Sequence, residues 1–298
     1  MNKNQKKNQQ NKNSNFSKSN TISNHAVASR MQANQKNLKP QFSSKDGNWN
    51  SEQNWIYGKH SVLAVILKQK RKLYKILLTQ KSSNELDQEL IKNKIKLDPS
   101  LIYIVDNNFI TSNLPENAVH QGFAVKAAPM PIIQEEDFIL EISKKEKNEL
   151  SPILILDQLT DPHNIGAIIR SAIAFGVKNI AIPKYNFPKE SGVMNKASSG
   201  IIEMADLIIV SNINNFMADL KKIGYWCIGL AGEGKETLSK AKEFNPIALI
   251  VGSEGDGIRE LIKKNCDLLV KIPMASEVES LNASNAAAIS LYELFGKN

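Results

Sequence analysis

The chain has 298 residues, 42% of them hydrophobic, and a formal net charge of +8. This length suits two globular domains, and the positive charge suits a polyanionic partner, because basic side chains release counterions from a phosphate backbone. No stretch approaches the roughly 18 to 20 apolar residues of a membrane helix, and the N-terminus lacks the apolar core of a secretory signal. We therefore expect a cytoplasmic protein without a membrane span.

Residues 1–54 form a tract of Asn, Gln, Lys and Ser with isolated apolar residues. So few apolar side chains cannot offset the entropy that a packed segment loses, and the tract predicts a disordered, basic tail. Two interpretations of the tail stay open. It is either an arm that tethers a nucleic acid or an extension without a specific role, and the composition slightly favours the second.

A small α/β domain is expected over residues 55–129. The pattern of apolar residues predicts helices at 60–68 and 85–92 and strands at 73–78 and 101–105, and the domain closes around 120–125. The stretch 130–149 begins beside prolines and ends in a charged run, which is typical of a linker. The second domain is therefore expected to span residues 150–298.

The second domain repeats a pattern of short apolar run, polar or glycine turn, and helix. The apolar runs lie at 153–156, 180–182, 207–210, 226–230, 247–251 and 268–272, and helices are expected to start near Asn164, Asn214, Ile258 and Asn285. Short apolar runs without strict alternation suit strands that are covered on both faces, so they predict a parallel sheet between helices. Sheets of this kind bind ligands in the turns at their carboxyl ends.

Several motif-like features lack the chemistry that they resemble. Glu236 stands where a Walker A loop needs Ser or Thr, and Gly252–Gly257 lacks the Gly-x-Gly-x-x-Gly order of a dinucleotide site. The histidines are scattered, and Cys227 and Cys266 have no Cys-x-x-Cys pattern or neighbouring histidine. These features argue against a nucleoside triphosphatase, a Rossmann cofactor site and a metal centre, and they favour reduced, partly buried cysteines.

Three strand-to-turn segments remain. In the first, residues 154–170, Asn164 is expected to cap a helix, Gly166 permits the close approach of a backbone or ligand, and Arg170 is expected to return roughly to the face of Asn164. The second, residues 249–258, runs from a strand into a glycine-rich turn. The third, residues 272–288, is a polar loop that enters a helix of small residues, which could pack closely in a dimer.

These segments resemble the three signature motifs of the SpoU (TrmH) branch of the SPOUT methyltransferases. The matching patterns are Asn-Ile-Gly-Ala-x-x-Arg at 164–170, Gly-Ser-Glu-Gly-x-Gly at 252–257, and Ile-Pro-Met with Ser-Leu-Asn-x-Ser at 272–284. The resemblance implies an α/β, trefoil-knotted parallel-sheet domain, S-adenosyl-L-methionine as cofactor, and a homodimer with the catalytic sites at its interface. Residues 55–129 are similar to a small ribosomal-protein-like RNA-binding domain, through Tyr57-Gly58 and His120-Gln121-Gly122.

The same resemblance implies roles for individual residues. The cofactor would be held around Gly252, Ser253, Ile272, Met274 and Leu281. The catalytic set would be Arg170, Asn164, Glu254 and Asn282, with Ser280 as a lesser member. Arginine stays protonated in proteins, so a clamp on an RNA phosphate that also polarises the reacting hydroxyl is physically easier for Arg170 than a role as base. No metal ion is implied.

The activity implied is methylation of a ribose 2′-hydroxyl in RNA, with a guanosine of large-subunit ribosomal RNA as the preferred substrate. A transfer-RNA ribose methyltransferase is the alternative within the same class, and the ordered domain at 55–129 favours ribosomal RNA over it. A catalytically silent RNA-binding or ribosome-assembly factor with the same fold is the alternative from another class. The presence of all four residues Asn164, Arg170, Glu254 and Asn282 argues against the silent factor.

Overall fold

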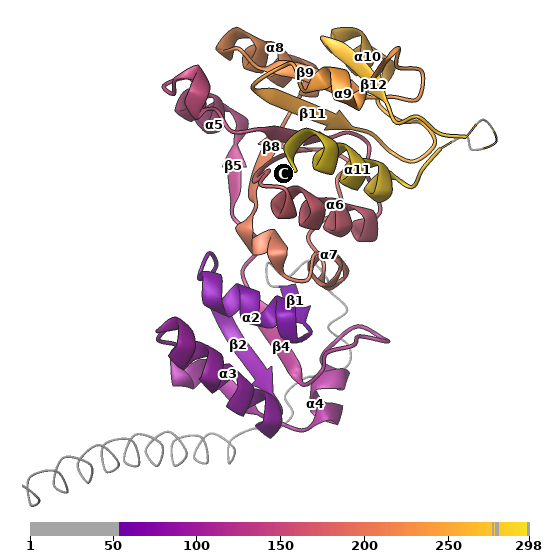
Figure 1. The fold of residues 1–298 in the computed structure, drawn as a ribbon. Coiled ribbons are helices and arrows are strands. Elements are labelled where there is room, and N and C mark those ends of the chain that lie inside the picture. Colours follow the sequence, from indigo (N-terminus) through magenta and orange to yellow (C-terminus); the bar gives the residue numbers. More distant parts are fainter. Residues whose placement is uncertain (1–53, 276, 278–279, 297–298) are drawn as a thin grey trace, which may run out of the picture.

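The computed structural model describes residues 54–275, 277 and 280–296. Residues 1–53, which hold almost the whole predicted tail, lie outside this range. The described chain forms an N-terminal domain and a larger C-terminal domain, stacked one above the other (Figure 1). Among the described residues, no helix has both the length and the apolar character needed to cross a membrane.

The N-terminal domain is built on a four-stranded sheet in the order β1-β4-β2-β3, where only β2 and β3 are parallel. Its elements are β1 (Asn54–Tyr57), α2 (Lys59–Lys68), β2 (Leu73–Leu78), α3 (Gln80–Asn93), η1 (Pro99–Leu101), β3 (Ile102–Ile104), α4 (Asn107–Ser112) and β4 (Phe123–Ala127). Apolar residues of α2 and α3 bury one face of the sheet, and α4 contributes to a smaller cluster on the other face.

The C-terminal domain holds an eight-stranded sheet in the order β10-β12-β9-β11-β6-β7-β8-β5, and every pair in it is parallel. Its strands are β5 (Ile132–Gln134), β6 (Ile153–Leu156), β7 (Asn179–Pro183), β8 (Asp206–Val210), β9 (Trp226–Leu230), β10 (Glu236–Thr237), β11 (Ile247–Val251) and β12 (Leu268–Lys271). The predicted parallel sheet is thus confirmed. The trefoil knot stays a prediction.

Helices cover both faces of this sheet, as the apolar strands require. They are α5 (Glu135–Ile142), α6 (Pro162–Ala174), α7 (Gly192–Ala197), α8 (Ile213–Ile223), α9 (Leu238–Ala241), α10 (Glu260–Asn265) and α11 (Ala283–Phe295), with the short 3-10 helices η2 (Lys147–Glu149) and η3 (Ile201–Met204). One buried cluster includes residues of α6, α9 and α11, and the other includes residues of α5, α8 and α10. The two layers hold the strand ends, and therefore the loops after them, in fixed positions.

The stretch 130–149 was expected to be a linker, and the structure corrects this expectation. Its first part, β5, pairs with β8 and adds a strand to the edge of the large sheet. The helix α5 then buries Phe138 and Ile142 in the cluster below α8. The prolines and charges suggested a linker, but Phe138 and Ile142 lie four residues apart, a helical spacing that places both on one apolar face.

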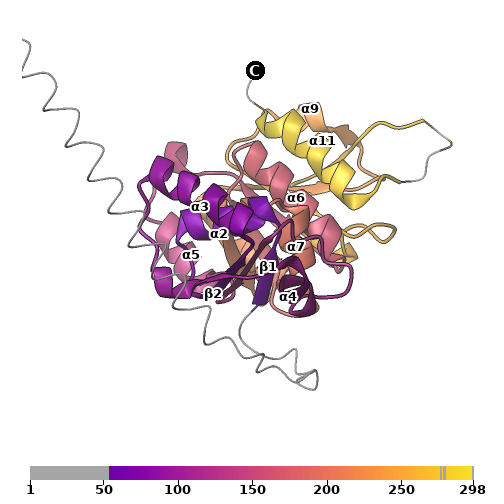
Figure 2. The ribbon, with the colours of Figure 1, turned by 90° about the horizontal axis from the view of Figure 1, so that it is seen from below.

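The two domains meet through α7, which packs on β1, and through η3, which packs on α2 (Figures 1 and 2). Tyr57 lies against Gly192, where a side chain would collide with its ring at 2.3 Å. The junction also buries charge, because Arg71 of the N-terminal domain pairs with Glu190 at 2.7 Å and with Glu203. Burial raises the pKa of Glu203, and the positive charge of Arg71 opposes that rise.

Candidate functional site

The loop after β11 folds back on itself at the carboxyl end of the sheet. Ser253 and Gly257 exchange two backbone hydrogen bonds of 3.1 Å, and Gly255 and Gly257 adopt φ values of 90° and 65° that favour glycine. A side chain on Gly252 would come within 2.1 Å of the Gly257 backbone. The glycines therefore permit a tight turn whose backbone comes close to the space beside it.

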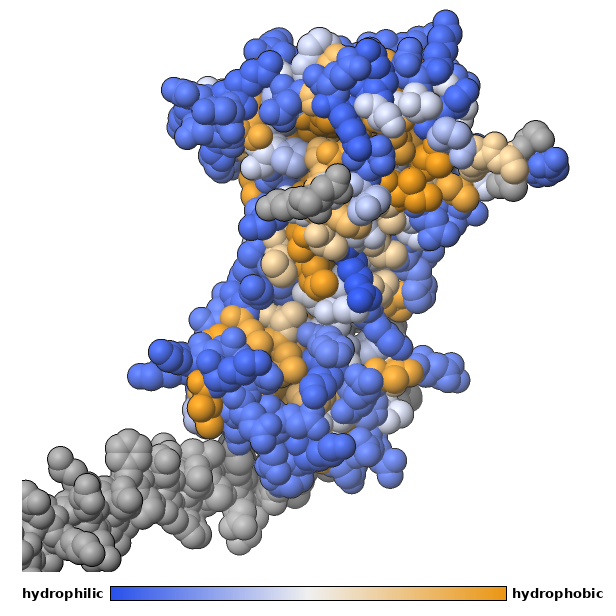
Figure 3. All heavy atoms as spheres, viewed as in Figure 1, coloured by the Kyte–Doolittle hydropathy of each residue, from blue (hydrophilic) through white to orange (hydrophobic). Residues whose placement is uncertain are grey.

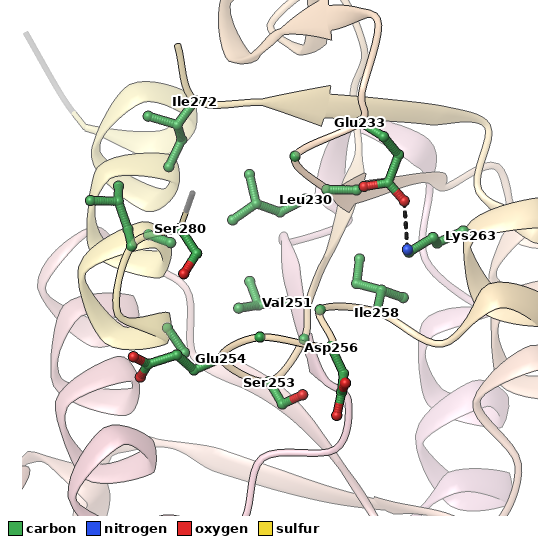
Figure 4. Close-up of a pocket in the computed structure, with 18 of the residues that line it drawn as sticks. Leu230, Glu233, Val251, Ser253, Glu254, Asp256, Ile258, Lys263, Ile272 and Ser280 are labelled. Carbon is green, nitrogen blue, oxygen red and sulfur yellow. Dashed lines mark ion pairs between the residues drawn. The ribbon is translucent and has the colours of Figure 1, made fainter. Parts of the chain in front are cut away.

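That space is a hollow of about 300 Å³ between the loop, the strand ends and the segment that enters α11. Leu230, Val251, Ile258 and Ile272 give it an apolar wall, and Figure 4 shows Ser280 at its α11 side, between Ile272 and Glu254. Seven of the ten predicted site residues line it, namely Gly252, Ser253, Glu254, Ile272, Met274, Ser280 and Leu281. The structure therefore places all five predicted cofactor residues at one hollow.

Two other predicted residues meet Glu254 at the rim of this hollow. The amide nitrogen of Asn282 donates to Oδ1 of Asn164 at 3.1 Å and to Oε2 of Glu254 at 3.0 Å. The side-chain oxygen of Asn282, Oδ1, accepts from the backbone N–H and the hydroxyl of Ser284, at 2.9 and 2.6 Å, and so caps α11. One asparagine thus ties together the three signature segments, since each of the three side chains comes from a different segment.

The start of α6 differs from the expectation. The helix begins at Pro162, and Asp161 caps it by accepting from the backbone N–H groups of His163 and Asn164. Asn164 is therefore not the cap, and its side chain is available to Asn282. Gly166 serves the close approach that was expected, because a side chain there would meet the Met194 carbonyl of α7 at 2.6 Å.

Arg170 lies apart from this cluster. Its exposed guanidinium donates to the Ser199 hydroxyl at 3.0 Å, and it does not line the hollow. The expectation that Arg170 shares a helix face with Asn164 is wrong, because six residues turn a helix by about 600° and leave the two side chains about 120° apart. Along the axis the two residues lie about 9 Å from each other.

Two ion pairs beside the hollow were missed by sequence reasoning. Asp157, fully buried at the end of β6, accepts from Arg259 through its backbone N–H at 3.0 Å and its Nε at 2.9 Å. This pair ties the loop after β11 to the first signature segment. Glu233 and Lys263 form the second pair, which Figure 4 shows at the edge of the hollow. A carboxylate directly after the apolar run 153–156 was the available signal for Asp157.

The cysteines take no part in this site. Cys227 is buried, Cys266 is partly buried, and both are free thiols, as expected. Burial raises the pKa of each thiol to about 12, which keeps both protonated and unreactive near neutral pH. Within the described ranges 54–275, 277 and 280–296, no group of three or more His, Cys, Asp or Glu residues could hold a metal ion.

Comparison with known proteins places this geometry in a family. Residues 151–292 match the SpoU rRNA Methylase family, and residues 55–132 match a family described as RNA 2′-O ribose methyltransferase substrate binding. A 23S rRNA (guanosine-2′-O-)-methyltransferase, RlmB of Yersinia pestis, is 33% identical over 239 residues that cover 80% of this chain and 95% of that protein. The chain belongs to the SpoU methylase family.

Other relatives agree with this assignment. An uncharacterized tRNA/rRNA methyltransferase of Synechocystis is 36% identical over 241 residues, or 80% of this chain, which spans 62% of the length of that relative. The SpoU methyltransferase AviRb of Streptomyces viridochromogenes, crystallised with AdoMet, has a TM-score of 0.65 at 22% identity, over 82% of this chain and 89% of that one. The likeness to AviRb supports the SpoU methylase fold, and the first family match contains the whole hollow and its rim.

Proposed function

We propose that this chain transfers the methyl group of S-adenosyl-L-methionine to a ribose 2′-hydroxyl of RNA, with a guanosine of large-subunit ribosomal RNA as substrate. The observation that carries the proposal is the contact of Asn282 with both Asn164 and Glu254 at the rim of the hollow. This contact joins three signature segments of a methylase family beside a space that suits a small organic cofactor. A hydrogen-bonded rim next to an apolar hollow is the arrangement expected where a reacting group must be oriented.

The hollow fits the cofactor in its chemistry. Its apolar wall suits the adenine ring, and the tight turn at Gly252 brings backbone groups close enough for hydrogen bonds. The carboxylates of Glu254 and Asp256 also line it and would favour a positively charged sulfonium, whereas the charge of Glu233 is balanced by Lys263. Bound there, the cofactor would supply an electrophilic methyl carbon on a positively charged sulfur, which leaves as a neutral thioether when the methyl group is transferred.

The chain's own residues then have to orient the ribose and help its hydroxyl lose a proton. Asn164, Asn282 and Glu254 hold one another, so the rim presents fixed donors and acceptors to the ribose without further ordering. Arg170 is exposed and held by one hydroxyl, which suits a cation that receives an RNA phosphate. Because Arg170 lies apart from the hollow of its own chain, it would polarise the reacting hydroxyl at the hollow of a second copy, with the catalytic sites at the interface of a homodimer. Ser280 lines the hollow and would contact the cofactor or the ribose (Figure 4).

Ribosomal RNA is preferred over transfer RNA for two reasons. The relative named as a 23S rRNA guanosine methyltransferase aligns with 80% of the chain, and the substrate-binding family match covers the N-terminal domain. This domain is joined to the catalytic domain by buried ion pairs, so it would hold bound RNA at a fixed place relative to the hollow.

A homodimer is part of the proposal. Ile289 and Tyr292 of α11 are 42% and 60% exposed, and the Tyr292 ring contacts Phe175 at the end of α6 with centroids 5.7 Å apart. Figure 3 shows hydrophobic residues gathered over α6 and α11 on this side of the C-terminal domain. An exposed apolar face of this kind suits a second copy of the chain.

Transfer of labelled methyl from S-adenosyl-L-methionine to unmodified ribosomal and transfer RNA tests the proposal. The expected result is label at one ribosomal position, with the methylated 2′-oxygen located by mapping. Label in transfer RNA alone would overturn the choice of substrate and keep the chemistry. No label in either RNA, together with no cofactor binding, would replace the proposal with a silent RNA-binding factor.

A further inference from the structure

A second cleft, of about 820 Å³, lies on the other side of the loop after β11. It opens where β6, β7 and β8 end, and Asp157, Pro183 and Val210 mark those three strand ends in its wall. Ser253, Glu254 and Asp256 line both this cleft and the cofactor hollow. The loop therefore separates the hollow from the cleft, and Glu254 lines both.

Side-chain amides line the cleft, and they have groups available for hydrogen bonds to a ligand. Gln158 and Asn186 are exposed, and in the part of the chain that the structure describes neither side chain makes a hydrogen bond. Asn212 uses its carbonyl oxygen to cap α8, accepting from two backbone N–H groups at 2.9 and 3.3 Å, which leaves its amide nitrogen to donate. Amides that both donate and accept match the edges of nucleobases.

An aromatic ring stands at the same cleft. Tyr185, in the segment after β7, is 67% exposed, and the Lys184 ammonium lies 5.8 Å from its ring centroid. A large exposed ring offers a stacking surface, and a lysine beside it offers a phosphate contact, which together are the features that bind unpaired nucleotides.

An ion pair holds the base of the cleft in place, and acidic side chains line the cleft. These charges determine which class of ligand it can bind. The half-exposed side chain of Arg259 is fixed by the fully buried Asp157 at 2.8 Å. The Ser253 hydroxyl oxygen is buried and has no hydrogen-bond partner among the described residues. The charge of Asp157 is balanced by Arg259, but Glu254 and Asp256 would repel a phosphate group inside the cleft, whereas their carboxylates could accept from the N–H groups of a neutral base.

We infer that this cleft receives the base of the nucleotide whose ribose is methylated. The base, turned out of its helix, stacks on Tyr185 and meets Gln158, Asn186 and Asn212, while its ribose reaches over the loop at Glu254 toward the hollow. Lys184 contacts the phosphate next to it. This inference rests on the proposed function, and it makes Tyr185 a residue that positions the substrate without touching the cofactor.

The test compares Tyr185→Ala, Tyr185→Phe and Leu140→Ala, all at exposed positions, with Leu140 in α5 as the control for an exposed apolar residue of the same domain. Loss of stacking is expected to lower kcat/KM for ribosomal RNA at least about tenfold in Tyr185→Ala, mainly through KM. Tyr185→Phe keeps the ring and is expected to stay within about threefold of the unchanged protein, as is Leu140→Ala. Binding of S-adenosyl-L-methionine, measured by calorimetry, should not change in any of them.

Ultraviolet cross-linking of the unchanged protein to unmodified ribosomal RNA gives a readout that does not need turnover. We expect a cross-link between the peptide containing Tyr185 and the methylated nucleotide. An active protein whose Tyr185→Ala variant keeps normal kcat/KM, or whose cross-links exclude this peptide, overturns the inference and leaves the proposed function standing. A protein that transfers no methyl group refutes the proposed function, and absence of the Tyr185 cross-link then refutes the cleft as well.

Discussion

Polar side chains join separate segments of this chain at two places, and the two places are built differently. At the domain junction the Arg71 side chain is fully buried between Glu190 and Glu203, and it also donates to the Ala128 carbonyl at 3.2 Å. At the rim of the hollow Asn164 and Asn282 are only partly buried, and Glu254 is exposed. At the junction the polar groups are paired with other groups of the protein, whereas at the rim they face the hollow.

This difference separates structural from functional use of the same residue types. A buried charge needs its partners, since removing one of them leaves an unpaired charge in a poorly solvated place. A partly exposed amide or guanidinium can lose a contact at little cost in stability, so its value lies in what it binds. The chain offers a direct contrast between two arginines, Arg71 at the junction and the exposed Arg170 on α6.

Replacing Arg71 by Ala should have the largest effect, and the effect should be on stability. The change leaves the buried carboxylate of Glu203 without the cation that it pairs with, and the free energy of unfolding is expected to fall by about 3–5 kcal/mol. Urea denaturation measures this loss. The matched control is Lys70→Ala, because Lys70 also crosses the junction, to Asp206 at 3.1 Å, but in a partly exposed pair worth about 1 kcal/mol or less. Equal losses in the two variants would contradict the structural role of Arg71.

Replacing Arg170 by Ala should give the opposite pattern. Loss of its guanidinium is expected to lower kcat for methyl transfer about 100- to 1,000-fold, the usual consequence of removing a group that stabilises developing charge. Because the side chain is exposed and donates one hydrogen bond, to Ser199, the melting temperature should stay the same. Single-turnover assays and a thermal melt check both parts. Normal turnover in this variant would remove Arg170 from the mechanism.

Replacing Asn282 tests the contact at the rim, and two variants separate its effect on activity from its effect on stability. Asn282→Ala loses the donor to Asn164 and Glu254 and also the cap of α11, so kcat/KM should fall about 10- to 100-fold and stability by about 1 kcal/mol. Asn282→Ser keeps an oxygen for the cap but has no amide nitrogen to donate to Asn164 and Glu254. It should lose similar activity with less loss of stability, and an active Asn282→Ser enzyme would show that the rim contact is dispensable.

The strands of the C-terminal domain could be predicted from sequence because parallel strands buried on both faces must be apolar throughout. The expected runs 153–156, 226–230 and 247–251 coincide with β6, β9 and β11 to the residue. Each of the three signature segments contains a loop at the carboxyl end of the sheet, where the strand order brings these loops together. The position of the hollow could therefore be predicted from the expected parallel sheet. The predicted cap of α6, Asn164, was wrong, and the residue that caps the helix is Asp161. Pro162 was the available signal, because proline favours the first turn of a helix and therefore indicates a cap at the residue before it.

The junction and the second cleft had no comparable signal. Arg71 and Glu203 lie far apart in the chain, and nothing in the local pattern of either residue indicates a buried partner. The cleft takes its residues from the ends of β6, β7 and β8, from the loops after these strands and from the loop after β11, which only the order of strands in the sheet brings together. Local patterns predict which residues are buried within an element, whereas contacts between distant polar side chains depend on the tertiary fold.

Calorimetric titration of S-adenosyl-L-methionine into three proteins tests most directly the claim that the hollow binds the cofactor and Arg170 acts on the substrate. The three are the unchanged chain, Leu281→Arg in the wall of the hollow and Arg170→Ala outside it. We predict that the unchanged chain and Arg170→Ala bind equally well, and that Leu281→Arg, if its melt shows that it is folded, binds at least about tenfold more weakly because a cation replaces an apolar contact and repels the sulfonium. Unchanged binding in a folded Leu281→Arg, or lost binding in Arg170→Ala, would contradict this division of the site.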